Sequence, residues 1–176
     1  MSEQATDRIA FLRRLRTVRD FTPDPVAEDA LRDVLEVGRW TGTANNRQPA
    51  EVVVVRDAAA RQKLTEYGAN SAAKAAAALV IVTAGDPERA EMETFDEGRI
   101  AERMQLAAAA HGLGAGVTWL KGEGPERAKE LLGIPREKRV RTVVAIGTRD
   151  EASIRAKPRN PQARQEIGEF ARWERY

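Results

Sequence analysis

Three short segments, far apart in the chain, carry the residue types that could hold a ligand. Residues 16–21 (RTVRDF) and 157–159 (KPR) place basic side chains near the two ends of the chain. Residues 43–49 (TANNRQP) form a loop rich in small amides and hydroxyls. Cations bind anionic groups, while uncharged donors orient a ring through its polar atoms. Together the segments predict a pocket for an anionic, hydrogen-bonding ring compound.

The residue types that perform covalent or metal chemistry are scarce. The chain has no cysteine, so thiolate sites are excluded, and around its single histidine, His111, we draw no Ser-His-Asp arrangement. His111 follows the longest expected helix, where the helix dipole favours an imidazolium, and we assign it no catalytic role. Glu97, Glu102 and His111 lack a convincing metal-ligand pattern. We therefore assign no catalytic or metal-binding residue.

The composition is typical of one globular domain. The 176 residues are 42% apolar and 32% charged, with a net charge of +2. Basic and acidic residues alternate along nearly every segment, which argues against a nucleic-acid partner. No apolar run approaches the ~20 residues of a membrane helix, and residues 1–7 lack the pattern of a secretory signal. These features predict a cytoplasmic protein that does not associate with membranes.

The N-terminal half alternates helices with short apolar runs. A first helix is expected to begin at Thr6 or Asp7, and others are expected over residues 28–40 and 58–67. The β-branched run 52–55 predicts a strand that is covered on both faces. Alanine-rich residues 72–78 predict further helical turns that lead into a buried strand at 79–83.

The C-terminal half continues the alternation. We expect a long helix over residues 95–111, whose alanines 107–110 permit close approach by another helix or a second subunit. Glycines 112, 114 and 116 imitate part of a dinucleotide-binding motif, but they follow a helix and precede a strand, the reverse of what pyrophosphate binding requires. The remaining elements are expected as a strand at 117–120, a helix at 125–132 and a strand at 140–146.

The end of the chain carries an apolar stripe. Ile167, Phe170, Trp173 and Tyr176 recur at intervals of three. Such a stripe either packs on its own domain or contacts a second copy, and we favour a homodimer. We accordingly describe residues 1–150 as the cofactor-binding domain and residues 151–176 as an extension that packs on the partner subunit.

In order along the chain, RTVRDFTPDPV, WTGTANNRQPAEVVVV, the GLG of residues 112–114 and KPRNP resemble the flavin-dependent nitroreductase family, from about residue 8 to 162. The resemblance implies an α+β fold with a central, mostly antiparallel sheet flanked by helices. It also implies a homodimer that exchanges its chain ends and binds FMN at each subunit interface. None of the four pieces is specific alone, and the case depends on their order and spacing.

The family's basic motifs imply the phosphate-binding residues. Arg16, Thr17 and Arg19 match its opening motif, with threonine in place of the usual serine. Lys157 and Arg159 match its basic pair near the end of the chain, and alone they would read equally well as a solvated tail. The sequence departs at Leu15, where the family commonly has another arginine. Arg14, Arg16 or the tail would then have to replace that arginine.

The resemblance also implies residues around the flavin ring. Thr43, Asn46 and Gln48 match the polar loop that the family places against the flavin, often from the partner subunit. Asn70 stands roughly where the family places an amide or a base at the pyrimidine edge, and a helix cap would explain it equally well. Lys121 and Gly122 fall where the family presents backbone amides near N5, and an ordinary surface turn is the alternative reading.

The implied reaction is a two-step exchange, in which NADH or NADPH delivers hydride to the flavin and a nitroaromatic or quinone then accepts it. Ala50 stands where the family usually has an aromatic residue, and either a remodelled core or a wider pocket follows from that change. Two alternatives stay open. The same fold performs other flavin reactions, such as dehalogenation or ene reduction, and the chain could also be a non-catalytic dimeric binding module.

Overall fold

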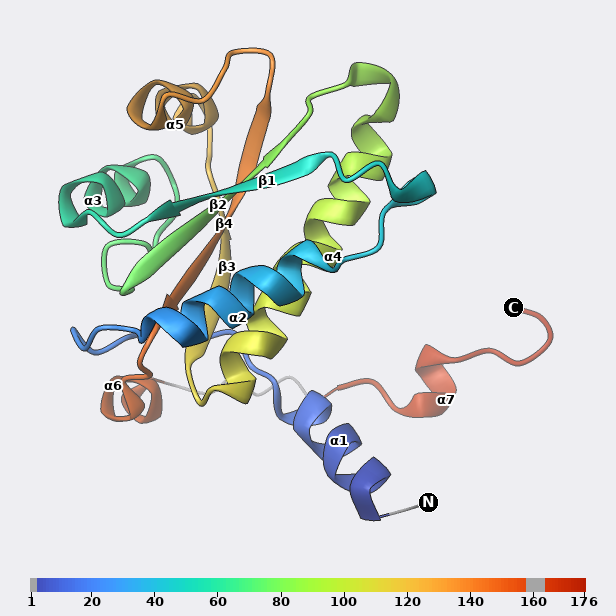
Figure 1. Ribbon diagram of the computed structural model, residues 1–176. Coiled ribbons are helices and arrows are strands. Elements are labelled where there is room, and N and C mark those ends of the chain that lie inside the picture. The colour runs from blue at the N-terminus through green and yellow to red at the C-terminus, as the bar shows by residue number, and fades with distance from the viewer. Residues whose placement is uncertain (1–2, 158–163) are drawn as a thin grey trace.

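A four-stranded antiparallel sheet forms the centre of the computed structural model, which describes residues 3–157 and 164–176 (Figure 1). The strand order is β1-β2-β4-β3, and every neighbouring pair is antiparallel. This architecture confirms the expected α+β fold. The strands are β1 (Ala50–Val55), β2 (Ala77–Thr83), β3 (Gly114–Trp119) and β4 (Arg139–Gly147).

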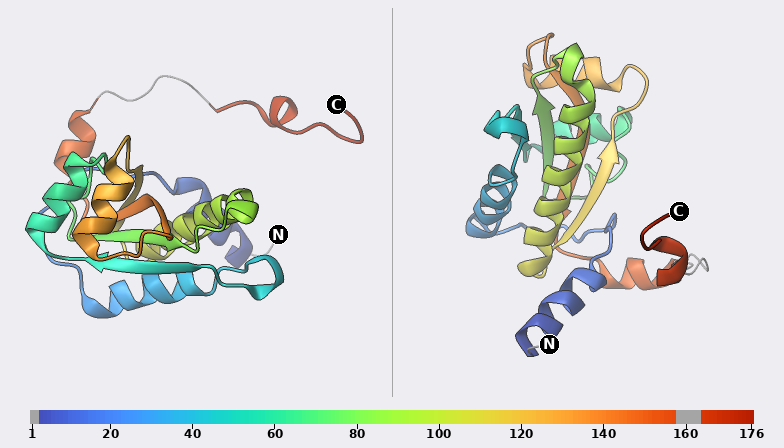
Figure 2. Two further views of the ribbon diagram at one scale, coloured as in Figure 1. Left: turned by 90° about the horizontal axis from the view of Figure 1, so that it is seen from above. Right: turned by 90° about the vertical axis from the view of Figure 1, so that its right-hand side faces the viewer.

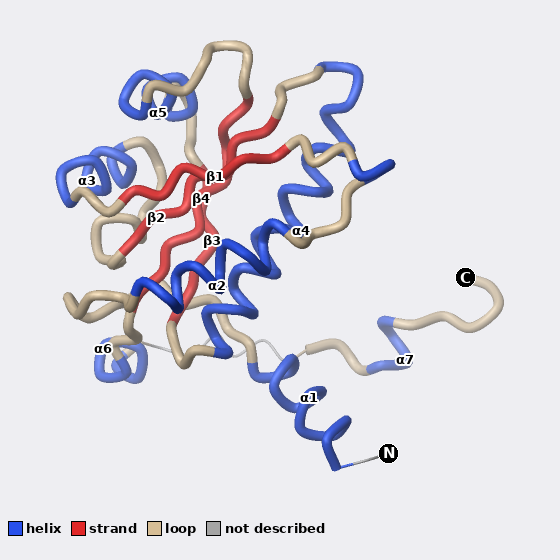
Figure 3. Tube along the Cα trace, viewed as in Figure 1, coloured by secondary structure: helices blue, strands red, loops and turns tan. Residues whose placement is uncertain are grey.

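Helices cover both faces of this sheet. Along the chain the helices are α1 (Glu3–Arg14), α2 (Glu28–Arg39), α3 (Ala58–Glu66), α4 (Ala90–Ala110), α5 (Gly124–Leu132), α6 (Glu151–Ala156) and α7 (Ile167–Phe170), with short 3-10 turns η1 (Ala44–Asn46) and η2 (Pro87–Arg89). The pair α2 and α4 lies on one face, and α3 and α5 lie on the other (Figures 1 and 3).

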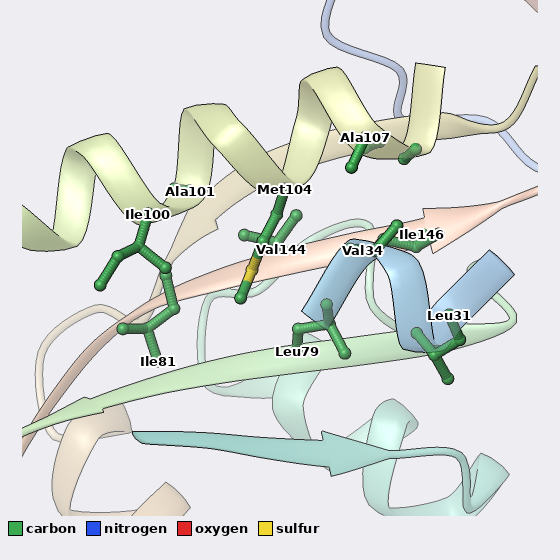
Figure 4. Packing of buried hydrophobic residues seen from close by; sticks show 13 residues of the cluster. Leu31, Val34, Leu79, Ile81, Ile100, Ala101, Met104, Ala107, Val144 and Ile146 are labelled. Carbon is green, nitrogen blue, oxygen red and sulfur yellow. The ribbon is translucent and has the colours of Figure 1, made fainter. Parts of the chain in front are cut away.

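Alternation along β2 explains why its sequence is continuously apolar. Leu79 and Ile81 pack with α2 and α4, whereas Val80 and Val82 pack with α3 and α5. Successive side chains of a strand point to opposite faces, so a strand covered twice needs apolar residues throughout. Figure 4 shows the first of these clusters, which includes Met104 of α4 and side chains of α2, β2 and β4.

Helices α2 and α4 approach each other closely. A Cβ atom built on Gly38 of α2 would lie 2.6 Å from Cε of Met104. At the end of α4, Nε2 of His111 lies 2.9 Å from the Asp33 carboxylate of α2. The tight helix pair expected from the small residues of this region is therefore present within one chain, and His111 serves as a contact between helices.

One expectation from the sequence is wrong, and another holds only in part. The run 52–55 packs on both faces of the sheet, through Val52 on the α2 and α4 side and through Val53 and Val55 on the other, but β1 is an edge strand of the described sheet and Val54 is 37% exposed. Residues 72–76 form turns and not a helix, while Ala77 and Ala78 already belong to β2. The Arg61 guanidinium of α3 binds the carbonyls of Ala72, Ala73 and Ala75. Those side-chain bonds replace the helical ones that alanine would otherwise favour.

Both ends of the chain project from the body formed by the sheet and its covering helices (Figures 1 and 2). Helix α1 buries none of its residues. The apolar stripe of the tail makes no core of its own, with Ile167, Phe170, Trp173 and Tyr176 between 74% and 109% exposed. Helix α6 differs, because its Ile154 packs on Val18 and Phe21 of the same chain.

Candidate functional site

A buried carboxylate joins three distant segments at one end of the sheet. Asp20, in the first basic segment, is only 6% exposed. Nζ of Lys157 donates to Oδ2 of Asp20, and Nζ of Lys74 lies 3.3 Å from Oδ1. The hydrogen bond from Lys157 lowers the pKa of Asp20 against the opposing effect of burial, and Lys74 lowers it further. We call Asp20, Lys74 and Lys157 the Asp20 cluster.

Helix α6 brings Lys157 to this place. The Asp150 carboxylate caps the helix by accepting from the Ser153 amide and hydroxyl, at 3.0 and 2.6 Å. The Asp150 amide in turn donates to the carbonyl of Asp20 at 3.1 Å. The structure thus brings Lys157 to Asp20 of the first basic segment. Arg159 lies outside the described residues.

Two glycines of β3 let the first basic segment pack closely against that strand. The Val18 amide donates to the Ala115 carbonyl at 2.8 Å. A Cβ on Gly116 would lie 2.1 Å from the Val18 carbonyl oxygen, and one on Gly114 would lie 2.8 Å from Cγ1 of Val18. Only glycine permits this approach. These glycines of the rejected dinucleotide motif therefore seat the segment that carries Arg16, Thr17 and Arg19.

Several guanidinium groups gather beside this segment. Arg14, Arg16 and Arg149 line a hollow of about 180 Å³ together with Leu15. Arg16 donates to the carbonyls of Arg13 and Leu15, at 2.8 and 2.7 Å, and Arg149 pairs with Glu151 at 2.6 Å. The guanidinium groups of Arg14 and Arg19 make no hydrogen bond or ion pair within the described residues. Leu15 adds no positive charge to this hollow, but three arginines line it beside Leu15.

The polar loop lies at the opposite end of the sheet. Ala50, which follows the loop, pairs with Thr83 at the end of β2. At the start of β2, Ala77 pairs with Ile146 of β4, and the bridge between Phe21 and Arg149 lies just beyond that level. The seven residues of β2 separate these two levels by about 20 Å, since a strand rises ~3.3 Å per residue. One protomer therefore does not bring Thr43, Asn46 and Gln48 to the Asp20 cluster.

Local bonds give the polar loop its shape. Oγ1 of Thr43 accepts from the Gln48 amide at 2.9 Å, and the Arg99 guanidinium of α4 donates to the Gly42 carbonyl at 2.6 Å. Asn46 and Gln48 have φ angles of 53° and 51°. Such left-handed positions cost energy in residues other than glycine and are concentrated at functional sites. The side chains of Asn46 and Gln48 are exposed.

Asn70 and Lys121 belong to two turns that pack on each other. The Lys121 amide donates to the Tyr67 carbonyl at 2.9 Å. Gly68 has a φ of 113°, and a Cβ there would lie 2.9 Å from the Lys121 nitrogen. The Lys121 amide is thus engaged, whereas the Gly122 amide bonds to none of the residues described. Ser71 follows Asn70 in the chain, and its buried Oγ has no hydrogen-bond partner within the described residues.

Lys74 belongs to the Asp20 cluster, but sequence reasoning did not select it. It is the only charged residue between Asn70 and Thr83, and a lysine in an alanine run reads as the solvated face of a helix. Arg149 was missed for a similar reason, because it follows the last strand in a region with no apolar pattern. Within the described residues, no group of His, Asp or Glu could hold a metal ion, and no helix is long and apolar enough to cross a bilayer.

Comparisons with known proteins agree with this architecture. A family model described as the nitroreductase family matches residues 12–97 and 66–148. A protein of Thermus thermophilus named NADH dehydrogenase is 30% identical over 175 residues, which cover 80% of this chain and 85% of that protein. The NADPH-flavin oxidoreductase of Vibrio harveyi is 25% identical over 161 residues, which cover 83% and 67% of the two chains.

A solved structure gives the same result for the fold. An FMN-dependent nitroreductase from Clostridium difficile superposes with a TM-score of 0.77 at 20% identity, over 96% of this chain and 99% of that one. At this identity the likeness concerns the fold. It extends over nearly the whole of both chains.

Proposed function

Because the chain belongs to the nitroreductase family, we propose that it is a homodimeric, FMN-dependent enzyme that uses NAD(P)H to reduce nitroaromatics or quinones. The family model and the relatives confirm the family that the motifs predicted. They also confirm the predicted enzyme class, an NAD(P)H-dependent oxidoreductase of the nitroreductase type. The acceptor, the dimer and the individual cofactor-binding residues are our proposals. The observation that carries them is the convergence of both chain ends at the Asp20 cluster.

The basic end of the sheet fits a phosphate group. The guanidinium groups of Arg14 and Arg19 have no partner within the described residues, and the Thr17 hydroxyl lies on the same exposed segment. Unpaired guanidiniums and a hydroxyl are the donors that a doubly charged phosphate requires. We propose that Arg16, Thr17, Arg19 and Lys157 hold the phosphate of FMN, with Arg159 as a further ligand. Asp20 would hold Lys157 in place.

The two packed turns fit the polar edge of a ring. The Gly122 amide and the buried Ser71 hydroxyl are donors without partners in the described part of the chain, and a buried polar group without a partner is costly. We propose that Asn70, Lys121 and Gly122 face the flavin ring. When bound, the flavin supplies the hydride-transfer chemistry. The cations nearby, above all Lys74, would stabilise negative charge on the reduced ring.

The distance between the polar loop and the Asp20 cluster supports a dimer. Thr43, Asn46 and Gln48 contact the same cofactor as the Asp20 cluster only if they come from a second copy. The exposed stripe of the tail supplies a surface that a second copy would bury. We therefore propose that residues 151–176 extend from the domain of residues 1–150 toward the partner, with α6 still packed on its own chain.

Colour and size test this function together. The purified protein should be yellow, should lose its flavin absorbance on anaerobic addition of NADPH or NADH, and should sediment as a dimer. Added quinone should restore the absorbance. A colourless dimer that takes up no added FMN would instead indicate the binding module. A yellow monomer would contradict the proposed origin of the polar loop.

A further inference from the structure

A cavity of about 380 Å³ lies between the polar loop and the start of α4. Its apolar lining comes from Ala44, Pro49, Ala84 and Met92. The side chain of Met92 is 42% exposed. Cavities of this size accommodate single-ring ligands. We call it the Arg47 pocket, after the basic residue on its lining.

The acidic groups of the pocket are already engaged. The Glu93 carboxylate is buried and accepts from the amides of Gly85 and Asp86, at 3.0 and 3.2 Å. Asp86 pairs with Arg89 at 3.1 Å, and Asp96 lies 3.6 Å from Arg99. Two of the three carboxylates are therefore offset by arginines, and backbone amides hold the third, Glu93.

Arg47 differs from its neighbours. It is exposed, it lines the pocket, and its guanidinium makes no hydrogen bond or ion pair within the described residues. It is the one charged side chain of the lining without such a partner there. A planar guanidinium next to an apolar wall binds the carboxylate or sulfonate of an aromatic compound, because the fork pairs with the anion while the ring packs on the wall.

The position of the pocket connects it to the reaction. Ala44 and Arg47 belong to the same loop as Asn46 and Gln48, which the proposed function places against the flavin of the partner. An acceptor in the pocket would therefore lie beside that flavin. This step rests on the proposed function. The pocket itself does not.

We propose that the Arg47 pocket receives the electron acceptor and that the preferred acceptors are single-ring nitroaromatics or quinones with an anionic substituent. Arg47 would act as a specificity-determining residue that contacts the substituent and not the reacting atoms. For a nitro group, NAD(P)H and one proton are consumed, the nitro group becomes a nitroso group, one oxygen leaves as water, and NAD(P)⁺ is released.

Two probes that share a ring and a nitro group test this proposal. 4-Nitrobenzoate is anionic at neutral pH, and 4-nitrobenzyl alcohol is neutral. The wild-type holoenzyme should show the higher kcat/KM for the anion. Arg47→Gln should lower the ratio of the two kcat/KM values about tenfold, equivalent to ~1.4 kcal/mol. Arg47→Lys should retain part of the preference.

Arg89→Gln provides the matched control, since Arg89 lines the same pocket but is paired with Asp86. It should leave the ratio within about twofold, because a partnered guanidinium contributes little further attraction. A preference that is equal in wild type and Arg47→Gln, or one that depends on Arg89, would overturn the proposal. So would a wild-type preference for the neutral probe.

A binding measurement separates this proposal from the proposed function. Equilibrium dialysis of oxidised protein with each probe needs no turnover. If wild type binds 4-nitrobenzoate more tightly than Arg47→Gln but reduces neither probe, the pocket is correct and the reductase function is wrong. If flavin is present and both probes are reduced without charge preference, the reductase stands and the Arg47 inference is wrong.

Discussion

The two ends of the sheet are built by different kinds of contact. The Asp20 cluster joins residues 20, 74 and 157 through ion pairs to one buried carboxylate. The polar loop keeps its shape mainly by bonds between near neighbours, such as Thr43 to Gln48, with one tie to α4 through Arg99. The first arrangement depends on the whole fold. The second depends on a few residues, so it can change without unfolding the protein.

This contrast suggests a division of labour. A site for a tightly held phosphate benefits from groups that are fixed by long-range contacts. We proposed that the polar loop faces exchanging substrates, and a loop in that role tolerates local strain, as at Asn46 and Gln48. The variants below test whether the two ends are distinct in stability and whether they act on the same cofactor.

The largest effect should come from the tail, which we propose joins the two ends through a second copy. Phe170→Glu with Trp173→Glu should yield a monomer that has lost most of its flavin, because a charged stripe cannot be buried at an interface. The side chains are 77% and 82% exposed in the single chain, so urea stability of the protomer should change by less than about 0.5 kcal/mol.

Sedimentation velocity and flavin absorbance measure this outcome. Arg175→Glu, which places a new negative charge on the same tail without removing an apolar side chain, is the control and should remain a yellow dimer. A double variant that stays dimeric and yellow would show that the tail does not connect the two ends.

Gly116→Ala should be the most damaging change at the Asp20 end. The added Cβ would meet the Val18 carbonyl oxygen at 2.1 Å, so the first basic segment must move. We expect a loss of about 3 kcal/mol in urea unfolding, together with weaker FMN binding. Gly98→Ala is the matched control, because nothing lies within 4 Å of its Cβ position in α4, and it should stabilise by about 0.5–1 kcal/mol.

Asp20→Asn should remove the charge that holds both lysines and cost about 1–2 kcal/mol at pH 7. The pKa of Asp20 is lowered in the folded state, so its contribution is present above the ordinary aspartate pKa of 3.8 and is lost as the pH falls through the folded-state value. Urea unfolding at several pH values should show the difference between wild type and Asp20→Asn shrinking below about pH 4. A difference that grows in acid would contradict this assignment.

The smallest change in stability should come from the polar loop. Thr43→Val removes the oxygen that accepts from the Gln48 amide and should cost about 0.5–1 kcal/mol or less. Proteolysis within residues 43–48 should nevertheless become faster, because the loop has few other contacts. Thr43→Ser keeps the hydroxyl and should behave as wild type. Equal proteolysis of the two variants would show that this bond does not shape the loop.

Much of the fold could be predicted from local patterns. The apolar run of β2, the amphipathic α2 and the glycines after α4 follow from rules that act over a few residues. The family was also accessible, because four short motifs stand in a specific order. The turns at residues 72–76 could not be predicted in this way, since the Arg61 bonds that replace a helix depend on how α3 packs.

The sequence by itself determined the chemical inventory: no cysteine, one histidine, basic segments at both ends and a polar loop between them. Only the tertiary structure decided which of these groups meet. It placed Lys74 and Lys157 on Asp20, left β1 at an edge, and set the polar loop at the far end of the sheet. The reason is that strand order and ion pairing are fixed by contacts between distant residues, which local sequence patterns do not encode.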